Sequence, residues 1–82
     1  MNKILKKLTI NETTTLFEIH APAVARKAQA GQFVIVCPRD WGERIPLTIA
    51  DYHAGQGVIT LVVQEIGKTT MEMCTMEEGE HL

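Results

Sequence analysis

The sequence predicts an all-β fold, a small closed antiparallel barrel with one short helix near its end. Five short runs of strand-forming residues recur along the chain, turn signals separate them, and one later segment has the pattern of a helix. Short strands spaced by turns favour a barrel over a sandwich or a parallel sheet. The 82 residues make one small domain, which can bury only ~60–65% of the surface that its unfolded chain exposes.

The first two predicted strands form a hairpin. Apolar residues alternate with Lys and Thr over Lys3–Ile10, Asn11–Glu12 is a turn signal, and Thr13–Ile19 has high β propensity. Pro22 ends the hairpin, because proline cannot donate a hydrogen bond to a ladder. We expect a helical turn over Val24–Ala30.

Three further strands follow this turn. Gln32–Cys37 is an apolar run bounded by Gly and Pro, which is typical of a buried strand. Ile45–Ala50 is predicted as the next strand, and its Pro46 implies an edge or a bulge. Val58–Gln64 is the strongest strand of the chain, with Val, Ile, Thr and Leu throughout.

The last part of the sequence predicts the helix. Thr69–Glu77 follows the break at Gly67, and Thr69 or Thr70 is the expected N-cap. Gly79–Leu82 then has the character of an entry into another strand. We therefore expect residues 1–82 to be one domain, the N-terminal part of a longer protein.

Composition argues against several classes of function. The net charge of −2 gives no electrostatic case for nucleic acid. No apolar run approaches the ~20 residues of a transmembrane helix, and the N-terminus has no signal-peptide pattern, so the expected location is the cytoplasm. Cys37 and Cys74 lack CxxC or metal spacing, which favours reduced thiols over a disulfide or a metal site.

Two segments carry the residues that point to a ligand. Arg44–Asp51 places a cation, a rigid Pro and a hydroxyl close together, and Val62–Thr70 places Gly, Lys and two Thr hydroxyls where a helix is expected to begin. Free N–H groups at such a terminus attract anions. An aromatic ring on the first segment and a diphosphate on the second would together describe a flavin dinucleotide.

The order of these segments resembles the flavin domain of the ferredoxin–NADP reductase superfamily. The closest resemblance is to the electron-transfer subunit of dihydroorotate dehydrogenase, the sulfide dehydrogenase subunit and the small subunit of NADH-dependent ferredoxin:NADP oxidoreductase. It covers nearly the whole chain but only the first third of the family's length. The matching segments are Ala30–Val34, Arg44–Thr48, Val62–Gln64 and Gly67–Thr70.

This resemblance implies a six-stranded Greek-key barrel that holds FAD. In the family the barrel is followed by a nucleotide-binding α/β domain and, in many members, by a Cys-rich segment with a 2Fe–2S cluster. It also implies an electron-transfer subunit that moves electrons between NAD(P)H and an iron–sulfur or partner-subunit acceptor. These residues contain no nicotinamide site, so we do not expect this chain alone to be active.

The resemblance also implies which residues contact FAD. Thr48 matches the Ser/Thr expected near flavin N5, and Leu47 matches the residue against the ring or ribityl chain. The Arg of the family's pattern falls on Ile45, so Arg44 is one residue out of register, and a β-bulge would return its guanidinium to the diphosphate. The implied cofactor residues are Arg44, Pro46, Leu47, Thr48, Val62, Val63, Gln64, Gly67, Thr69 and Thr70.

Each half of FAD has its own implied contacts. The backbone of Val62–Gln64 would meet the adenine or ribityl side, and the N–H groups and hydroxyls of Gly67–Thr70 would hold the diphosphate. No catalytic residue and no metal ligand is implied. A Walker A loop does not fit, because it needs Gly five positions before Gly67, where Val62 stands.

One alternative from a different class stays open. The chain would then be a small β-barrel interaction module without a cofactor, and its Gly-Lys-Thr-Thr turn would be structural. Flavin absorption separates the two hypotheses. If the flavin hypothesis holds, we expect a larger oxidoreductase subunit as partner, and self-association through an exposed apolar patch that includes Leu47 and Trp41.

Overall fold

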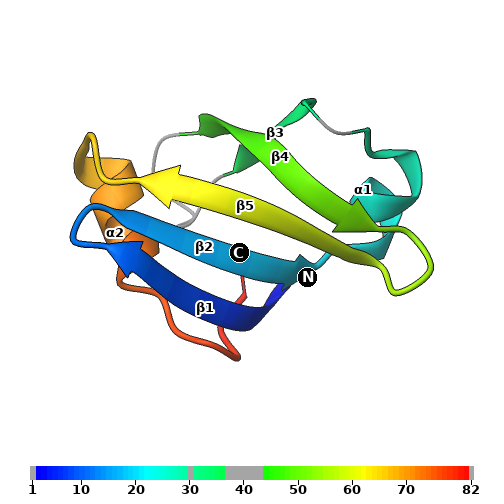
Figure 1. Cartoon of the computed structure of the whole chain (residues 1–82), viewed down its shortest axis with the longest axis horizontal. Helices are drawn as coiled ribbons and strands as arrows, with labels where there is room; N and C mark the ends of the chain where they lie inside the picture. Colours follow the sequence, from blue (N-terminus) through cyan, green and yellow to red (C-terminus); the bar gives the residue numbers. More distant parts are fainter. Residues whose placement is uncertain (1, 30, 37–43, 82) are drawn as a thin grey trace.

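A computed structural model describes residues 2–29, 31–36 and 44–81 of the chain. Five antiparallel strands and two short helices make up this part (Figure 1). The elements are β1 (Lys3–Asn11), β2 (Thr14–His20), α1 (Pro22–Lys27), β3 (Phe33–Val36), β4 (Ile45–His53), β5 (Val58–Gln64) and α2 (Lys68–Cys74).

The strands form one sheet in the order β1-β2-β5-β4-β3, and every neighbouring pair is antiparallel. The predicted antiparallel β fold is therefore confirmed. The predicted closed barrel of six strands is wrong in detail: over the described residues there are five strands, and the sheet is not closed. The expected sixth strand corresponds only to a single antiparallel bridge, in which His81 pairs with Lys3 at the outer edge of β1.

A second helix, α1, corrects the prediction of one helix. It begins at Pro22, two residues before the expected helical turn, and it ends at Lys27. Proline suits the first turn of a helix, because its fixed φ is helical and the N–H that it lacks would have no intrahelical acceptor. Arg26 and Lys27 lie in the last turn, where positive charge is favourable.

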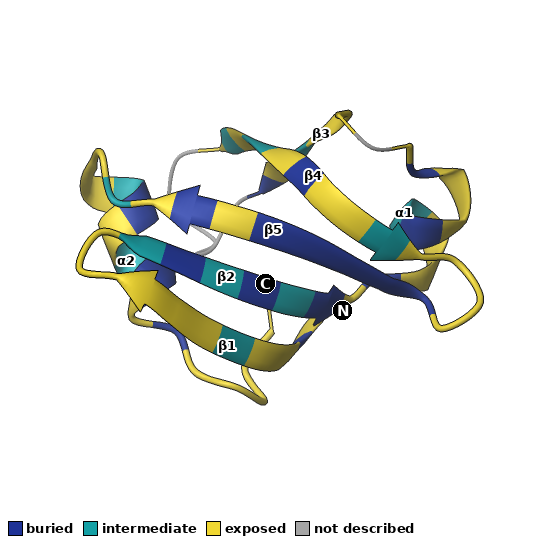
Figure 2. Ribbon diagram, viewed as in Figure 1, coloured by how far each residue is buried: buried dark blue, intermediate teal, exposed yellow. Residues whose placement is uncertain are grey.

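The hydrophobic core gathers side chains from all five strands and from both helices, and the central strands β2 and β5 supply five of its fourteen buried residues (Figure 2). Phe17 and Leu61 are fully buried, and β5 is buried at five of its seven positions, as suits the central strand. Met73 and Met76 close one end of the core, as expected for gap-filling side chains, whereas Met71 is exposed.

The C-terminal segment runs back along β1. The Ile4 N–H donates to the Glu80 carbonyl at 2.8 Å, and the Gly79 N–H donates to the Ile4 carbonyl at 2.8 Å. Lys7 adds an ion pair, with 3.5 Å between its Nζ and a Glu77 carboxylate oxygen. These contacts hold the segment after α2 beside the first strand.

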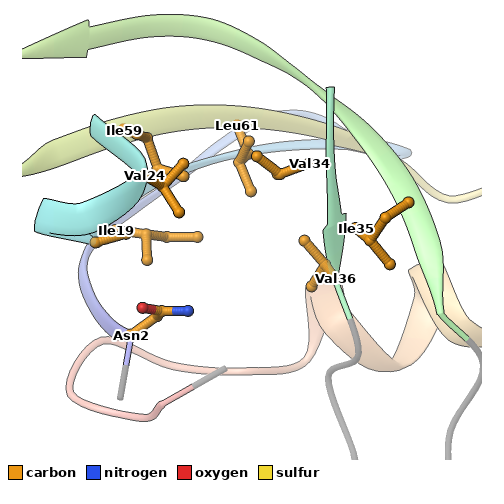
Figure 3. Close-up of a pocket in the computed structure, with 9 residues that line it drawn as sticks. Asn2, Ile19, Val24, Val34, Ile35, Val36, Ile59 and Leu61 are labelled. Carbon is orange, nitrogen blue, oxygen red and sulfur yellow. The ribbon is translucent and has the colours of Figure 1, made fainter. Parts of the chain in front are cut away.

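A cavity of about 260 Å³, lined mainly by aliphatic residues, lies between α1, β3 and the start of the chain (Figure 3). Core side chains of β2 and β5 form its floor, and α1 and β3 form its walls. Asn2 is the only polar residue among the described ones that line this cavity, and the described lining contains none of the predicted site residues. In the described part of the chain, neither helix is long and apolar enough to cross a membrane.

Candidate functional site

Strand β4 changes its pairing partner halfway along its length. Its first four residues pair with β3, from Val36↔Ile45 to Phe33↔Thr48. From Ile49 onward it pairs with β5, beginning at Ile49↔Leu61, with a register shift immediately after that pair. The two halves of β4 therefore lie in different ladders, and β4 and β5 diverge before Ile49.

A cleft of about 450 Å³ lies between the diverging ends of β4 and β5 and extends to the start of α2. This volume is in the range of ~300–1,000 Å³ that small-molecule sites occupy. The lining residues come from three segments that the fold brings together: Ile45, Pro46, Leu47, Thr48, Val62, Gln64, Ile66, Gly67, Lys68, Thr69 and Thr70.

Eight of the ten predicted cofactor residues line this cleft. The other two do not: Val63 is fully buried in the core, and Arg44 lies exposed just before β4. The bulge suggested for Arg44 does not occur within the paired part of β3 and β4, where the register is continuous. Three lining residues were not predicted: Ile45, Ile66 and Lys68. Of these, Lys68 belongs to the Gly-Lys-Thr-Thr motif from which its neighbours were predicted.

The apolar wall of the cleft differs from expectation. Leu47 is only half-buried and packs partly against the core. Exposed apolar surface comes instead from Ile66, which is 81% exposed, and from Val62, which is 39% exposed. Trp41, expected on the same wall, lies outside the described residues, as does Cys37.

Backbone groups also face the cleft. The Ile49 N–H donates to the Gln32 carbonyl at 2.7 Å, so the alternation of an antiparallel ladder turns the backbone groups of Pro46 and Thr48 away from β3, toward β5. In the same way, the Glu65 N–H donates to the Thr13 carbonyl at 2.7 Å on the β2 side of β5. The backbone N–H and carbonyl of Gln64, one residue earlier, therefore face β4.

The groups of Pro46 and Gln64 lie beyond the last pair of the β4–β5 ladder, Ile49↔Leu61, whereas those of Thr48 adjoin that pair. Gln64 thus presents a strand edge to the cleft rather than to a neighbouring strand. At the facing position Pro46 has no N–H that would be left without a partner. Pro46 was expected to mark an edge or a bulge. It lies on an edge, because this half of β4 pairs with β3 alone.

The turn from β5 into α2 is held by one hydroxyl. Thr70 Oγ1 accepts hydrogen bonds from the Ile66 and Gly67 N–H groups, both at 3.0 Å, and it donates to the Gly67 carbonyl at 2.9 Å. Gly67 is the N-cap, with extended backbone. The expected N-cap at Thr69 or Thr70 is therefore wrong by two or three residues, because Thr70 stabilises the cap from the third position of the helix.

Among the described residues that line the cleft, only Lys68 has a charged side chain. Two hydroxyl-bearing residues also line the cleft, Thr48 on β4 and Thr69 in the first turn of α2. The N–H groups of Lys68 and Thr69 belong to the first turn of α2, where no intrahelical acceptor exists. The cleft therefore combines an apolar wall, a strand edge and a locally cationic end.

Comparison with known proteins relates the whole chain to part of larger oxidoreductases. No family model matches. The chain is 44% identical over 80 residues to a Thermotoga maritima protein named dihydroorotate dehydrogenase B (NAD(+)), electron transfer subunit homolog, and it spans 28% of that protein. It is 43% identical over 82 residues to a Clostridium beijerinckii protein described as an uncharacterized protein in adh 3'region, of which it also spans 28%.

A solved structure agrees with these relatives. A chain from the NADH-dependent reduced ferredoxin-NADP oxidoreductase structure, described as giving insights into flavin-based electron bifurcation, is 43% identical and superimposes with a TM-score of 0.95. The match covers 99% of this chain and 29% of that one. The relationship that the sequence motifs predicted is confirmed, and the chain spans less than a third of the length of these relatives.

Proposed function

We propose that this chain is the flavin-binding domain of an oxidoreductase electron-transfer subunit and that the cleft between β4 and β5 holds FAD. The observation that carries the proposal is the convergence of two segments, Pro46–Thr48 and Val62–Thr70, on one cleft. They are separated in the sequence, and the divergence of β4 from β5 opens space between them. The names of the relatives, an electron transfer subunit and a ferredoxin-NADP oxidoreductase, support the same class of function.

The residues of the cleft fit the parts of FAD. Pro46, Val62 and Ile66 offer apolar contact to a flat ring system, and the Thr48 hydroxyl offers a hydrogen bond to its polar edge. The Gln64 strand edge suits the ribityl or adenine groups. Lys68 and the N–H groups of the turn suit the negative charge of a diphosphate. Since α2 has only seven residues, we assign this role to individual N–H groups rather than to a long helix dipole.

The chain's own contribution is to bind and orient the cofactor. FAD, when bound, supplies hydride and single-electron chemistry that side chains lack. We further propose that the chain is the N-terminal domain of a longer protein, which uses NAD(P)H and an iron–sulfur or partner-subunit acceptor. A larger oxidoreductase subunit is the proposed partner, and the cytoplasm is the proposed location.

One observation favours the alternative, an interaction module without a cofactor. Thr70 satisfies the turn internally, so the Gly-Lys-Thr-Thr segment is stable without any ligand. Ile66 and Met71 are exposed beside it and border a shallow groove along α2, as expected of a protein-binding surface. If the chain is such a module, we expect no flavin binding.

Titration of the 82-residue chain and of the longer protein with FAD separates the two proposals. We expect saturable binding that quenches flavin fluorescence, tighter in the longer protein, with FAD preferred to FMN. Val62→Trp fills the cleft and should abolish binding, whereas Leu8→Trp, at an exposed position on β1 away from the cleft, should not. Absence of binding up to about 1 mM FAD in both proteins would overturn the flavin proposal.

A further inference from the structure

The hydroxyl of Thr70 has no hydrogen-bonding capacity left for a ligand. A threonine hydroxyl offers one donor and two acceptor sites. In the turn before α2 both acceptor sites receive N–H groups, from Ile66 and Gly67, and the donor is directed to the Gly67 carbonyl. The side chain is also buried, with 8% of its surface exposed. Thr70 therefore lines the cleft without offering it a free polar group.

These hydrogen bonds decide which backbone groups of the turn remain open. The N–H groups of Ile66 and Gly67 are turned inward onto Thr70. The Gly67 carbonyl accepts both the Thr70 hydroxyl and the Met71 N–H, the latter at 2.9 Å, which fixes the peptide that leads into Lys68. The N–H groups of Lys68 and Thr69, next in the chain, are left as the donors at the cationic end of the cleft.

We propose that Thr70 is a positioning residue, which acts on the cofactor only through the turn. It orients the Lys68 and Thr69 N–H groups toward the phosphate groups of a bound flavin nucleotide, and it does not itself contact them. Thr69, one position earlier, carries the hydroxyl that does. This inference rests on the proposed function and departs from the motif-based expectation that both threonine hydroxyls hold the diphosphate.

The test compares Thr70→Val, Thr70→Ser and Thr69→Val, each titrated with FAD and with riboflavin, which has no phosphate. Thr70→Val should weaken FAD binding about tenfold and leave riboflavin binding unchanged, because only the phosphate contacts depend on the turn. Thr70→Ser keeps the hydroxyl and should restore FAD affinity to within about twofold of the wild type.

The unliganded proteins provide a readout that separates positioning from direct contact. Thr70→Val should lower the thermal midpoint without FAD and speed amide hydrogen exchange at Ile66 and Gly67, because their acceptor is gone. Thr69→Val should weaken FAD binding while leaving the midpoint and these two exchange rates as they are. A Thr70→Val protein with weakened FAD binding but unchanged exchange would show direct contact and overturn the inference.

Two further outcomes distinguish this inference from the function on which it rests. If the wild-type protein binds neither FAD nor riboflavin, the proposed function fails. If it binds both, and Thr70→Val retains wild-type FAD affinity or loses FAD and riboflavin affinity equally, only the positioning role fails. Circular dichroism shows whether Thr70→Val still folds, and if it does not, Thr70→Ser decides: wild-type exchange at Ile66 and Gly67 with tenfold weaker FAD binding overturns the inference.

Discussion

Gly57 packs so closely on Pro22 that a Cβ atom added to Gly57 would lie 2.9 Å from the proline Cβ and 3.1 Å from its Cα. Gly57 ends the turn between β4 and β5, and Pro22 begins α1. The Gly57 carbonyl also accepts the Ala21 N–H at 2.8 Å. This contact joins the β4–β5 hairpin to the helix that covers one end of the core.

Gly57→Ala should therefore be strongly destabilising. The residue has φ of 68°, which an alanine adopts with strain, and the new methyl would meet the backbone of Pro22. We expect a loss of about 2–4 kcal/mol in the free energy of unfolding, measured by urea denaturation. Gly55→Ala is the matched control in the same turn, since nothing lies within 4 Å of its added Cβ. Equal effects of the two changes would contradict the close contact.

Phe17→Ala should lower the free energy of unfolding more than the same substitution at an exposed aromatic residue. Phe17 is on β2, between β1 and β5, and it is fully buried. Its truncation leaves a cavity in the core, so we expect a loss of about 3–5 kcal/mol in the free energy of unfolding. Phe33→Ala removes the same side chain from a position that is 67% exposed and should change stability by less than about 0.5 kcal/mol. Thermal unfolding of both variants checks that Phe17 belongs to the core and that Phe33 does not.

Lys68→Gln tests the charge at the end of the cleft. Removing this charge, the only one on a described lining side chain, should weaken FAD binding roughly fivefold at low salt, or about 1 kcal/mol for an exposed charge pair. The difference from wild type should shrink as salt is added, because screening already weakens the wild-type interaction. Lys6→Gln on β1, outside the cleft, should have no effect. A salt-independent loss would assign Lys68 a packing role instead.

Cys74 provides a pH-dependent prediction. Burial raises the pKa of its thiol above the ordinary value of 9.0, and the Thr15 hydroxyl opposes the shift. Because the folded-state pKa is higher than the unfolded one, this thiol contributes stability below pH 9.0 that is lost as pH rises through the folded-state pKa. The free energy of unfolding should fall more steeply above pH 9 in the wild type than in Cys74→Ala. Parallel pH profiles would contradict the shift.

The sequence predicted the strands better than their closure. Strong β propensity and turn residues located all five strands, and Val58–Gln64 was predicted to the residue. The helices were less well predicted, because Pro22 has opposite meanings at the end of a strand and at the start of a helix. Whether a sheet closes depends on pairing between distant segments, which no local pattern encodes.

The sequence likewise predicted the residues of the candidate site better than their arrangement. Motif spacing identified most of the residues that line the cleft, including Thr48 and Thr69. It did not predict that β4 would change its partner from β3 to β5 at Ile49, since that change depends on the pairing of three strands. Nor could it distinguish the hydroxyls of neighbouring threonines, because only the folded turn directs that of Thr70 inward.

The position of β5 has a consequence for the order of folding. It is the last of the five strands along the chain, yet it lies between β2 and β4 at the middle of the sheet. During synthesis the β1–β2 and β3–β4 pairs emerge first, as two separate hairpins, and no other described strand pairs with both of them before Val58–Gln64 leaves the ribosome. We expect nascent chains that stop before Val58 to remain protease-sensitive, with cooperative folding beginning only once this strand is available to unite both halves.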